Sequence, residues 1–157
     1  MFGNKVSLKE KMLLNLSYND KEIKRQIEAE LGKPFGLRER IKMRGNGSPK
    51  LILKEASEEI TQLMARDKNR NVCNIEMRPN GIIIGFRSKL ENYGLIVPYR
   101  KLVIFKGNSD EYTLYKDNHF FRIIAGKKDV AVHNFMKKLL EAKAAATPQN
   151  PDFGDIA

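Results

Sequence analysis

Hydrophobic and polar residues alternate through the middle of the chain, as they do in strands that bury one face. Cys73, Ile75 and Met77 show this two-residue period, and a turn signal, Pro-Asn-Gly, follows at 79–81. The apolar run 82–86 comes next. This order of strand, tight turn and strand predicts a β-hairpin.

Further strand-like runs follow at short intervals, each bounded by a turn or bend signal. The runs lie at 95–97, 102–105, 112–115 and 119–124, and the signals at 91–94, 107–110 and 117–118. Strands at such spacing are typical of an antiparallel sandwich or barrel. Because Phe120 and Phe121 are adjacent in a strand, one of them must face away from the other.

The beginning of the chain has helical spacing instead. Ser7 and Glu10 stand at the distance of a capping box and precede apolar positions that predict a helix over 8–16. A second helix is predicted over 20–31, ended by Gly32. We interpret 1–34 as a helical arm that packs on the rest of the protein or on a partner.

A change of period marks the segment after this arm. Residues 37–44 alternate between basic and mainly apolar side chains, which predicts a strand, and 45–49 read as a turn. The run 51–53 is consistent with a returning strand, and 56–64 has helical spacing. Whether 50–66 is strand or helix stays open.

The last element predicted is an amphipathic helix that begins after Asp129. Its apolar stripe consists of Val132, Phe135, Met136, Leu139 and Leu140. Residues 144–157 are rich in Ala, Pro, Asn and Asp, and we expect a flexible tail. The predicted organisation is a helical arm at 1–34, a β domain with its helix at 35–143, and the tail.

Composition agrees with a globular protein and adds a strong positive charge. The chain has 157 residues, with 29 Lys and Arg against 19 Asp and Glu, for a formal charge of +10. An excess of this size favours nucleic acid, an anionic membrane surface or an acidic protein as partner. Neither a membrane-spanning apolar run nor a secretory signal is recognisable, so we expect a cytoplasmic protein.

Few residues offer the chemistry of a reaction. His119, His133 and the single cysteine, Cys73, are too few and too scattered in sequence for a structural zinc site. Cys73 shares the apolar phase of its strand, so we expect a core residue. No nucleophile, base and orienting group can be assembled from the sequence. We therefore expect no metal, no cofactor and no enzymatic activity.

The basic side of 37–44 is the most specific indication of function in the sequence. Its members are Arg38, Arg40, Lys42 and Arg44. In a strand these side chains would share one face at intervals of about 6.6 Å, which suits successive phosphates of a nucleic-acid strand. A solvated edge strand that uses charge to prevent aggregation is the other interpretation.

Four segments between 72 and 143 carry a resemblance. They read VCNIEMRPNGIIIGFR, YGLIVPYRKLVIFKG, YTLYKDNHFF and DVAVHNFMKKLLEAK. This part of the chain resembles an uncharacterised family of PH-like proteins from Bacteroidetes bacteria. The resemblance implies an α+β protein with a PH-like antiparallel β-sandwich or open barrel and a C-terminal capping helix. It also implies binding of a peptide, a protein or a lipid headgroup, although the turn at 78–81 is too tight for a phosphoinositide cage.

Two functions follow from these observations. The first is a non-enzymatic protein-interaction module that offers a groove or a sheet edge, with Phe153 and Ile156 of the tail as further contact residues. The alternative is a basic accessory protein that binds a nucleic-acid backbone through the four cations between 38 and 44. An anionic membrane surface ranks third among the partners, and a small-molecule substrate is not expected.

Overall fold

A computed structural model describes residues 12–66, 71–108 and 110–146 of the chain. Its strands are β1 (Leu13–Asn15), β2 (Leu51–Ala56), β3 (Val72–Arg78), β4 (Gly81–Ser88), β5 (Glu91–Pro98), β6 (Val103–Lys106), β7 (Glu111–Lys116) and β8 (His119–Ile124). Its helices are α2 (Lys21–Leu31), α3 (Leu37–Lys42), α4 (Glu58–Met64), the short 3-10 turn η1 (Tyr99–Lys101) and α5 (Val130–Ala146). None of the described helices is both long and apolar enough to cross a bilayer.

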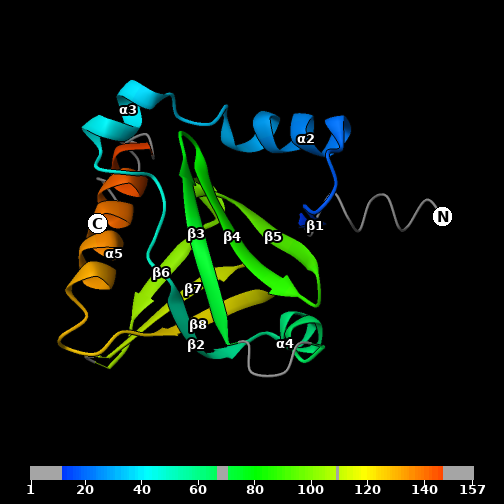
Figure 1. Ribbon diagram of the computed structural model, residues 1–157. Coiled ribbons are helices and arrows are strands. Elements are labelled where there is room, and N and C mark those ends of the chain that lie inside the picture. The colour runs from blue at the N-terminus through cyan, green and yellow to red at the C-terminus, as the bar shows by residue number, and fades with distance from the viewer. Residues whose placement is uncertain (1–11, 67–70, 109, 147–157) are drawn as a thin grey trace, which may run out of the picture.

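The described strands form one antiparallel sheet in the order β1-β5-β4-β3-β2-β8-β7-β6. The sheet bends so strongly that β3, β4 and β5 cross over β6, β7 and β8 (Figure 1). Phe86 of β4 and Phe121 of β8 bring their ring centroids to 6.1 Å across the interior. The protein is therefore an α+β fold built on a bent sheet whose two halves face each other.

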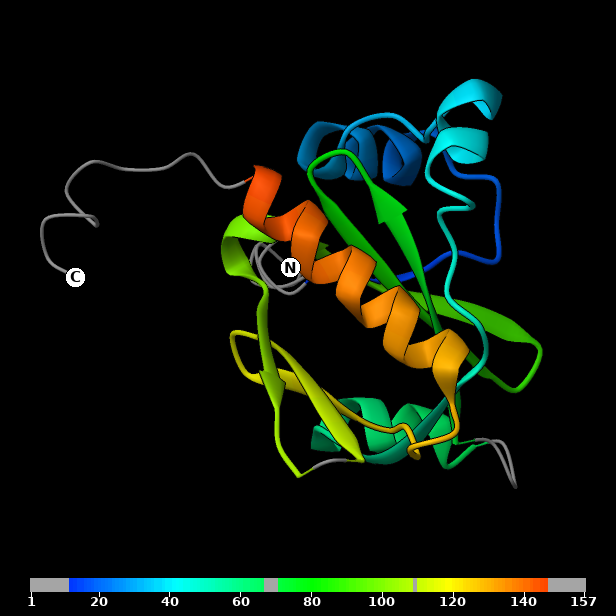
Figure 2. The ribbon, with the colours of Figure 1, turned by 90° about the vertical axis from the view of Figure 1, so that its left-hand side faces the viewer.

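Helices close the space between the two halves. α5 runs across the open side of the sheet (Figure 2) and buries Val132, Phe135, Met136 and Leu139. α4 adds the buried side chains of Ile60 and Met64 to the same core. The apolar stripe predicted for the last helix is thus confirmed at these positions, whereas Leu140 is exposed.

The second predicted helix is confirmed and packs against the sheet. The Asp20 carboxylate accepts hydrogen bonds from the backbone N–H groups of Glu22 and Ile23 at 2.8 and 3.3 Å, which fixes the beginning of α2. Ile27 and Leu31 then join a second apolar cluster on the outer face of β4 and β5. Residues 12–34 consequently form part of the folded body.

The predicted helix over 8–16 is wrong where the structure describes it. Leu13–Asn15 form β1, which pairs with β5. Leu13 points into the main core and Leu14 into the cluster below α2, so both apolar neighbours are buried on opposite faces of a strand. In a helix the two side chains would point only about 100° apart around the axis, not to opposite faces. Residues 1–11 lie outside the described part of the chain.

The predicted strand over 37–44 is also wrong, because α3 occupies this segment. Leu37 and Ile41, which the alternation would have buried, are 67% and 69% exposed. Alternation predicts a strand only where a neighbouring surface buries one face. Here Lys138 of α5 donates hydrogen bonds to the carbonyl oxygens of Met43 and Gly45 and anchors the chain just after the helix.

The structure also corrects two predicted boundaries and answers one question that the sequence left open. The bend expected at 91–94 lies inside β5, and the turn is at Lys89, which has φ of 56°. The open question at 50–66 resolves into a strand to Ala56 and a helix from Glu58. α5 continues to Ala146, so the tail does not begin at 144.

Candidate interaction surface

The outer face of β6, β7 and β8 carries a group of apolar and aromatic side chains that we call the edge patch. It consists of Val103, Phe105, Tyr115 and Phe120. Val103 stands opposite Tyr115, and Tyr115 opposite Phe120, so these three lie in one row across the strands. Val103 and Phe105 are each 58% exposed. Contiguous exposed apolar side chains of this kind are typical of interaction sites.

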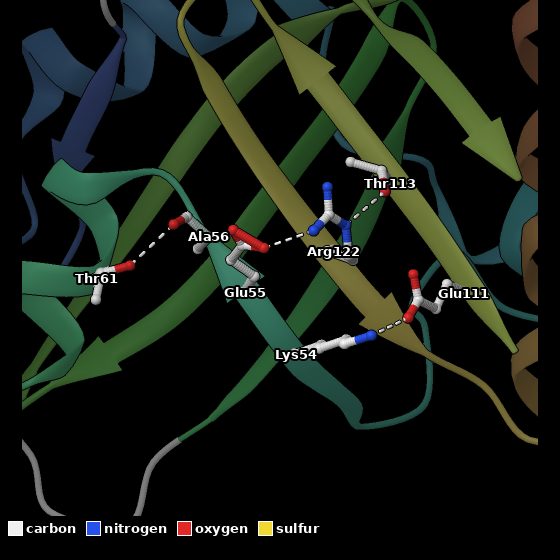
Figure 3. Close-up of polar contacts among 7 residues, drawn as sticks. All are labelled: Lys54, Glu55, Ala56, Thr61, Glu111, Thr113 and Arg122. Carbon is white, nitrogen blue, oxygen red and sulfur yellow. Dashed lines mark hydrogen bonds and ion pairs between the residues drawn. The ribbon is translucent and has the colours of Figure 1, made fainter. Parts of the chain in front are cut away.

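Charged side chains beside the edge patch are held in fixed pairs. Arg122 donates one hydrogen bond to Glu55 and another, of 3.4 Å, to the hydroxyl of Thr113, and Lys54 pairs with Glu111 (Figure 3). The guanidinium carbon of Arg122 also lies 5.6 Å from the ring centroid of Phe120. These contacts compensate the charges and leave the aromatic surface as the accessible feature.

The edge patch borders a free edge of the sheet. Within the described residues β6 pairs only with β7, and it ends the strand order. An unpaired edge presents backbone N–H and C=O groups to which a further strand can bind. A hollow of about 370 Å³ lies beside Phe105, Thr113, Tyr115 and Arg122. The surface thus combines backbone hydrogen-bonding groups with places for apolar side chains.

The basic residues predicted as an anion-binding row do not form a row. Arg38, Arg40 and Lys42 lie on α3, and Arg44 follows it with φ of 60°. At 100° per residue, Arg38 and Lys42 share one side of the helix and Arg40 points to the opposite side. All four are exposed. Both ribbon views place α3 away from β6 (Figures 1 and 2).

The other predicted contact residues, Phe153 and Ile156, lie outside the described part of the chain. Sequence reasoning missed Val103 and Phe105 as surface residues, because their strand looked like any other buried run. The expectation for the aromatic pair is confirmed, since Phe121 is fully buried and Phe120 faces outward in the edge patch.

A serine, a histidine and a carboxylate also come together, at the beginning of α4. The Ser57 hydroxyl lies 3.4 Å from Nδ1 of His119, and Nε2 of His119 lies 3.8 Å from Glu59. Ser57 also binds Phe120 twice, because its backbone N–H donates to the Phe120 carbonyl and its hydroxyl accepts from the Phe120 N–H. These contacts join the beginning of α4 to β8. Both Ser57 and His119 are buried there.

The other histidine and the cysteine have structural environments as well. His133 lies 2.8 Å from the Tyr112 hydroxyl and 2.9 Å from the Gly126 carbonyl, which ties α5 to the chain before it. Cys73 is buried as predicted, and burial raises the pKa of its thiol to about 12. Among the residues that the structure describes, no three potential metal ligands gather at one place.

The comparisons with known proteins identify no relative from which a family or a function could be taken. Protein-family models, curated proteins and solved structures were each compared with this chain, and none of them matched.

Proposed function

We propose that this protein is a non-enzymatic protein-interaction module that binds an extended segment of a partner along β6. The observation that carries the proposal is the coincidence of the edge patch with an unpaired strand at the end of the sheet. In strand addition, main-chain hydrogen bonds supply affinity and alternate side chains supply specificity. The exposed pair Val103 and Phe105 has the spacing that such alternate contacts need.

We also propose that the fold is PH-like, and the strand order supports this. β2 to β5 form one meander and β6 to β8 a second, and the two are joined where β2 pairs with β8. α5 then covers the open side (Figure 2). A bent antiparallel sheet closed by a C-terminal helix is the arrangement that the resemblance implies. Fold analogy alone carries little weight for function, so the edge patch remains the main argument.

The chemistry of β6 indicates which segments it would bind. Two apolar side chains at alternate positions of the partner would pack on Val103 and Phe105 in the edge patch. Lys106, at the end of the strand, is exposed and has no carboxylate partner among the described residues, so an acidic residue there would be favourable. We therefore expect an extended apolar segment that carries an acid near one end.

A phage-displayed library of random peptides tests the proposal with a defined probe. We expect selected peptides to carry alternating apolar residues and to bind with micromolar affinity. Phe105→Glu should weaken their binding about tenfold or more, because it places an unpaired charge under an apolar side chain. N-methylation of alternate peptide amides should abolish binding by removing the donors to β6.

Val130→Glu provides the matched control, because Val130 is 61% exposed but lies on α5. Selected peptides should bind this variant as they bind the unmodified protein. If no peptide is enriched, or if Phe105→Glu and Val130→Glu bind the enriched peptides equally, β6 is not the binding site.

Nucleic-acid binding remains the second candidate function. Its support is the concentration of four cations between 38 and 44, where Glu39 is the only acid. Among the described residues, none of the four cations has a carboxylate partner. The helical geometry of α3 disperses these charges, which is why we rank this function below peptide binding.

A further inference from the structure

The outer face of β3, β4 and β5 holds a hollow of about 630 Å³, separate from the edge patch. Residues from these three strands, from the segment before β2 and from the chain just after β1 surround it. The side chains that matter here are Leu16, Lys50, Asn74, Arg87 and Asn92, with Gly85 on the floor. Its volume falls in the range of sites that bind small organic molecules.

Gly85 lies in the floor of this hollow, and Gly94 beside it on β5 lies under Leu16. Asn74, Gly85 and Gly94 stand side by side on β3, β4 and β5, so two of three outward positions in this row have no side chain. Neither glycine has a positive φ, and each position could hold another residue as far as the backbone is concerned. A Cβ atom on Gly85 would lie only 2.6 Å from Oδ1 of Asn74. A side chain at Gly85 would therefore displace Asn74 and take up room in the hollow.

Apolar side chains bound one side of the hollow. Leu16 extends over Gly94, where an added Cβ would meet Cδ1 of Leu16 at 2.6 Å and Cγ2 of Ile83 at 2.9 Å. Ile83 belongs to the cluster that α2 covers, so this wall is held in place by the helix. The wall offers a surface on which a flat or aliphatic group can pack.

Positive charge and amides line the remaining sides. Lys50 and Arg87 are exposed and, among the described residues, neither has a carboxylate partner. The one acid in the lining, Glu76, is paired with Arg78, whose Nε lies 2.5 Å from it. Asn74 and Asn92 add side-chain amides that can donate and accept hydrogen bonds. The hollow is thus a recess with one apolar wall, side-chain amides and two cations that have no carboxylate partner among the described residues.

We propose that this recess binds a small organic anion, a carboxylate or a phosphate monoester, with an apolar ring or chain. The apolar part would lie over Gly85 against Leu16, and the anionic group would be within reach of Lys50 and Arg87. An oxyanion suits this site because charge-assisted hydrogen bonds from Lys and Arg are the strong ones. The ligand would occupy a face that peptide binding at β6 leaves free.

Titration of the ¹⁵N-labelled full chain with phenylacetate and with phenyl phosphate tests the proposal. We expect saturable shifts of the amide signals of Asn74, Gly85 and Arg87, and whichever compound binds more tightly identifies the class of anion. Inorganic phosphate and benzyl alcohol carry the charge and the ring separately. Both should bind at least about tenfold more weakly than the better of the two anions.

Variants then locate the site. Lys50→Gln and Arg87→Gln should each weaken binding about fivefold or more, because each removes one charged donor. Gly85→Val should abolish binding by filling the recess, and Asn74 has room to turn aside because it is exposed. Lys127→Gln, an exposed lysine on another part of the surface, is the matched control and should change nothing.

Three results would overturn the proposal. The first is no saturable shift with either anion up to about 10 mM, a concentration that would reveal even a weak site. The second is that the double variant Lys50→Gln/Arg87→Gln binds the anions as tightly as the unmodified protein does. The third is an inorganic phosphate affinity equal to that of phenyl phosphate, which would show that the apolar wall contributes nothing. The variants should retain the amide spectrum of the folded protein, which separates loss of binding from loss of structure.

Discussion

At the scale of single residues, the least expected feature is a buried lysine. Lys116 ends β7 with only 2% of its surface exposed. Burial lowers the pKa of its ammonium group to about 8, while the nearby Asp117 carboxylate opposes the shift. The folded protein therefore binds its proton less firmly than the unfolded chain does. Folding carries the full penalty for the buried charge at any pH below about 8.

The pH dependence of stability should reveal this penalty. Between pH 8 and 10.5 the unfolded chain binds more protons at this position, so the contribution of Lys116 to the free energy of unfolding rises with pH. We expect Lys116→Met to be more stable than the unmodified protein at pH 7. The difference should shrink by about 1–2 kcal/mol by pH 9.5. Urea unfolding of both proteins at the two pH values measures it, and a constant difference would contradict the assignment.

At the scale of elements, the contact of α2 with the β3–β4 turn links the beginning of the chain to the sheet. Leu31 is fully buried, and its side chain lies over Gly81. A Cβ atom at Gly81 would stand 2.5 Å from Cδ2 of Leu31, 2.3 Å from the Val97 carbonyl oxygen and 2.8 Å from Cα of Pro98. Two of these three neighbours are backbone atoms, which cannot move without disturbing β5.

Gly81→Ala should consequently destabilise the protein by about 3 kcal/mol, in the upper range for overpacking. Gly47→Ala is the matched control, because nothing lies within 4 Å of a Cβ atom at Gly47 and its φ is not positive. Urea unfolding should show a small change for the control and a large one for Gly81→Ala. Equal midpoints for the two variants would mean that α2 and β5 adjust freely around the new methyl group.

Elements were predictable where burial and periodicity agree. The β3–β4 hairpin, the hairpin of β7 and β8, α2 and α5 all follow from local pattern and turn residues. The strand predicted over 37–44 failed because alternation does not reveal whether a neighbouring surface exists. The helix predicted over 8–16 failed because Leu13 and Leu14 are buried on opposite faces. In both segments the outcome depends on distant parts of the chain.

At the scale of the whole molecule, the strand order decides which surfaces are accessible. β2 pairs with β8, and Glu55 meets Arg122 across 67 positions of sequence. This pairing leaves β6 at the end of the sheet and brings the edge patch together. Likewise, the recess on β3, β4 and β5 needs these strands to pair in the register that places Gly85 beside Asn74. Neither site has a motif, so the sequence predicted the type of sheet but neither candidate binding site.

The positions of the basic side chains on the molecule predict how strongly nucleic-acid affinity should depend on salt concentration. For single strands, the logarithm of affinity falls with the logarithm of salt concentration by about 0.7 per phosphate contact. Four cations in a strand row would contribute a slope of about −2.8. On α3 only Arg38 and Lys42 share a side, so we expect these positions to contribute about −1.4.

Fluorescence anisotropy with a labelled oligothymidine, measured over a range of salt concentrations, provides these slopes. Arg38→Gln/Lys42→Gln should make the slope shallower by about 1.4, whereas the matched pair Lys21→Gln/Lys24→Gln on α2 should change it much less. Both pairs consist of exposed residues and lower the net charge equally, so the comparison isolates position from net charge. Equal changes would indicate attraction to net charge alone. If Arg40→Gln made the slope shallower by a similar amount, both sides of α3 would contact phosphate. That result would contradict the expectation that only the side with Arg38 and Lys42 does so.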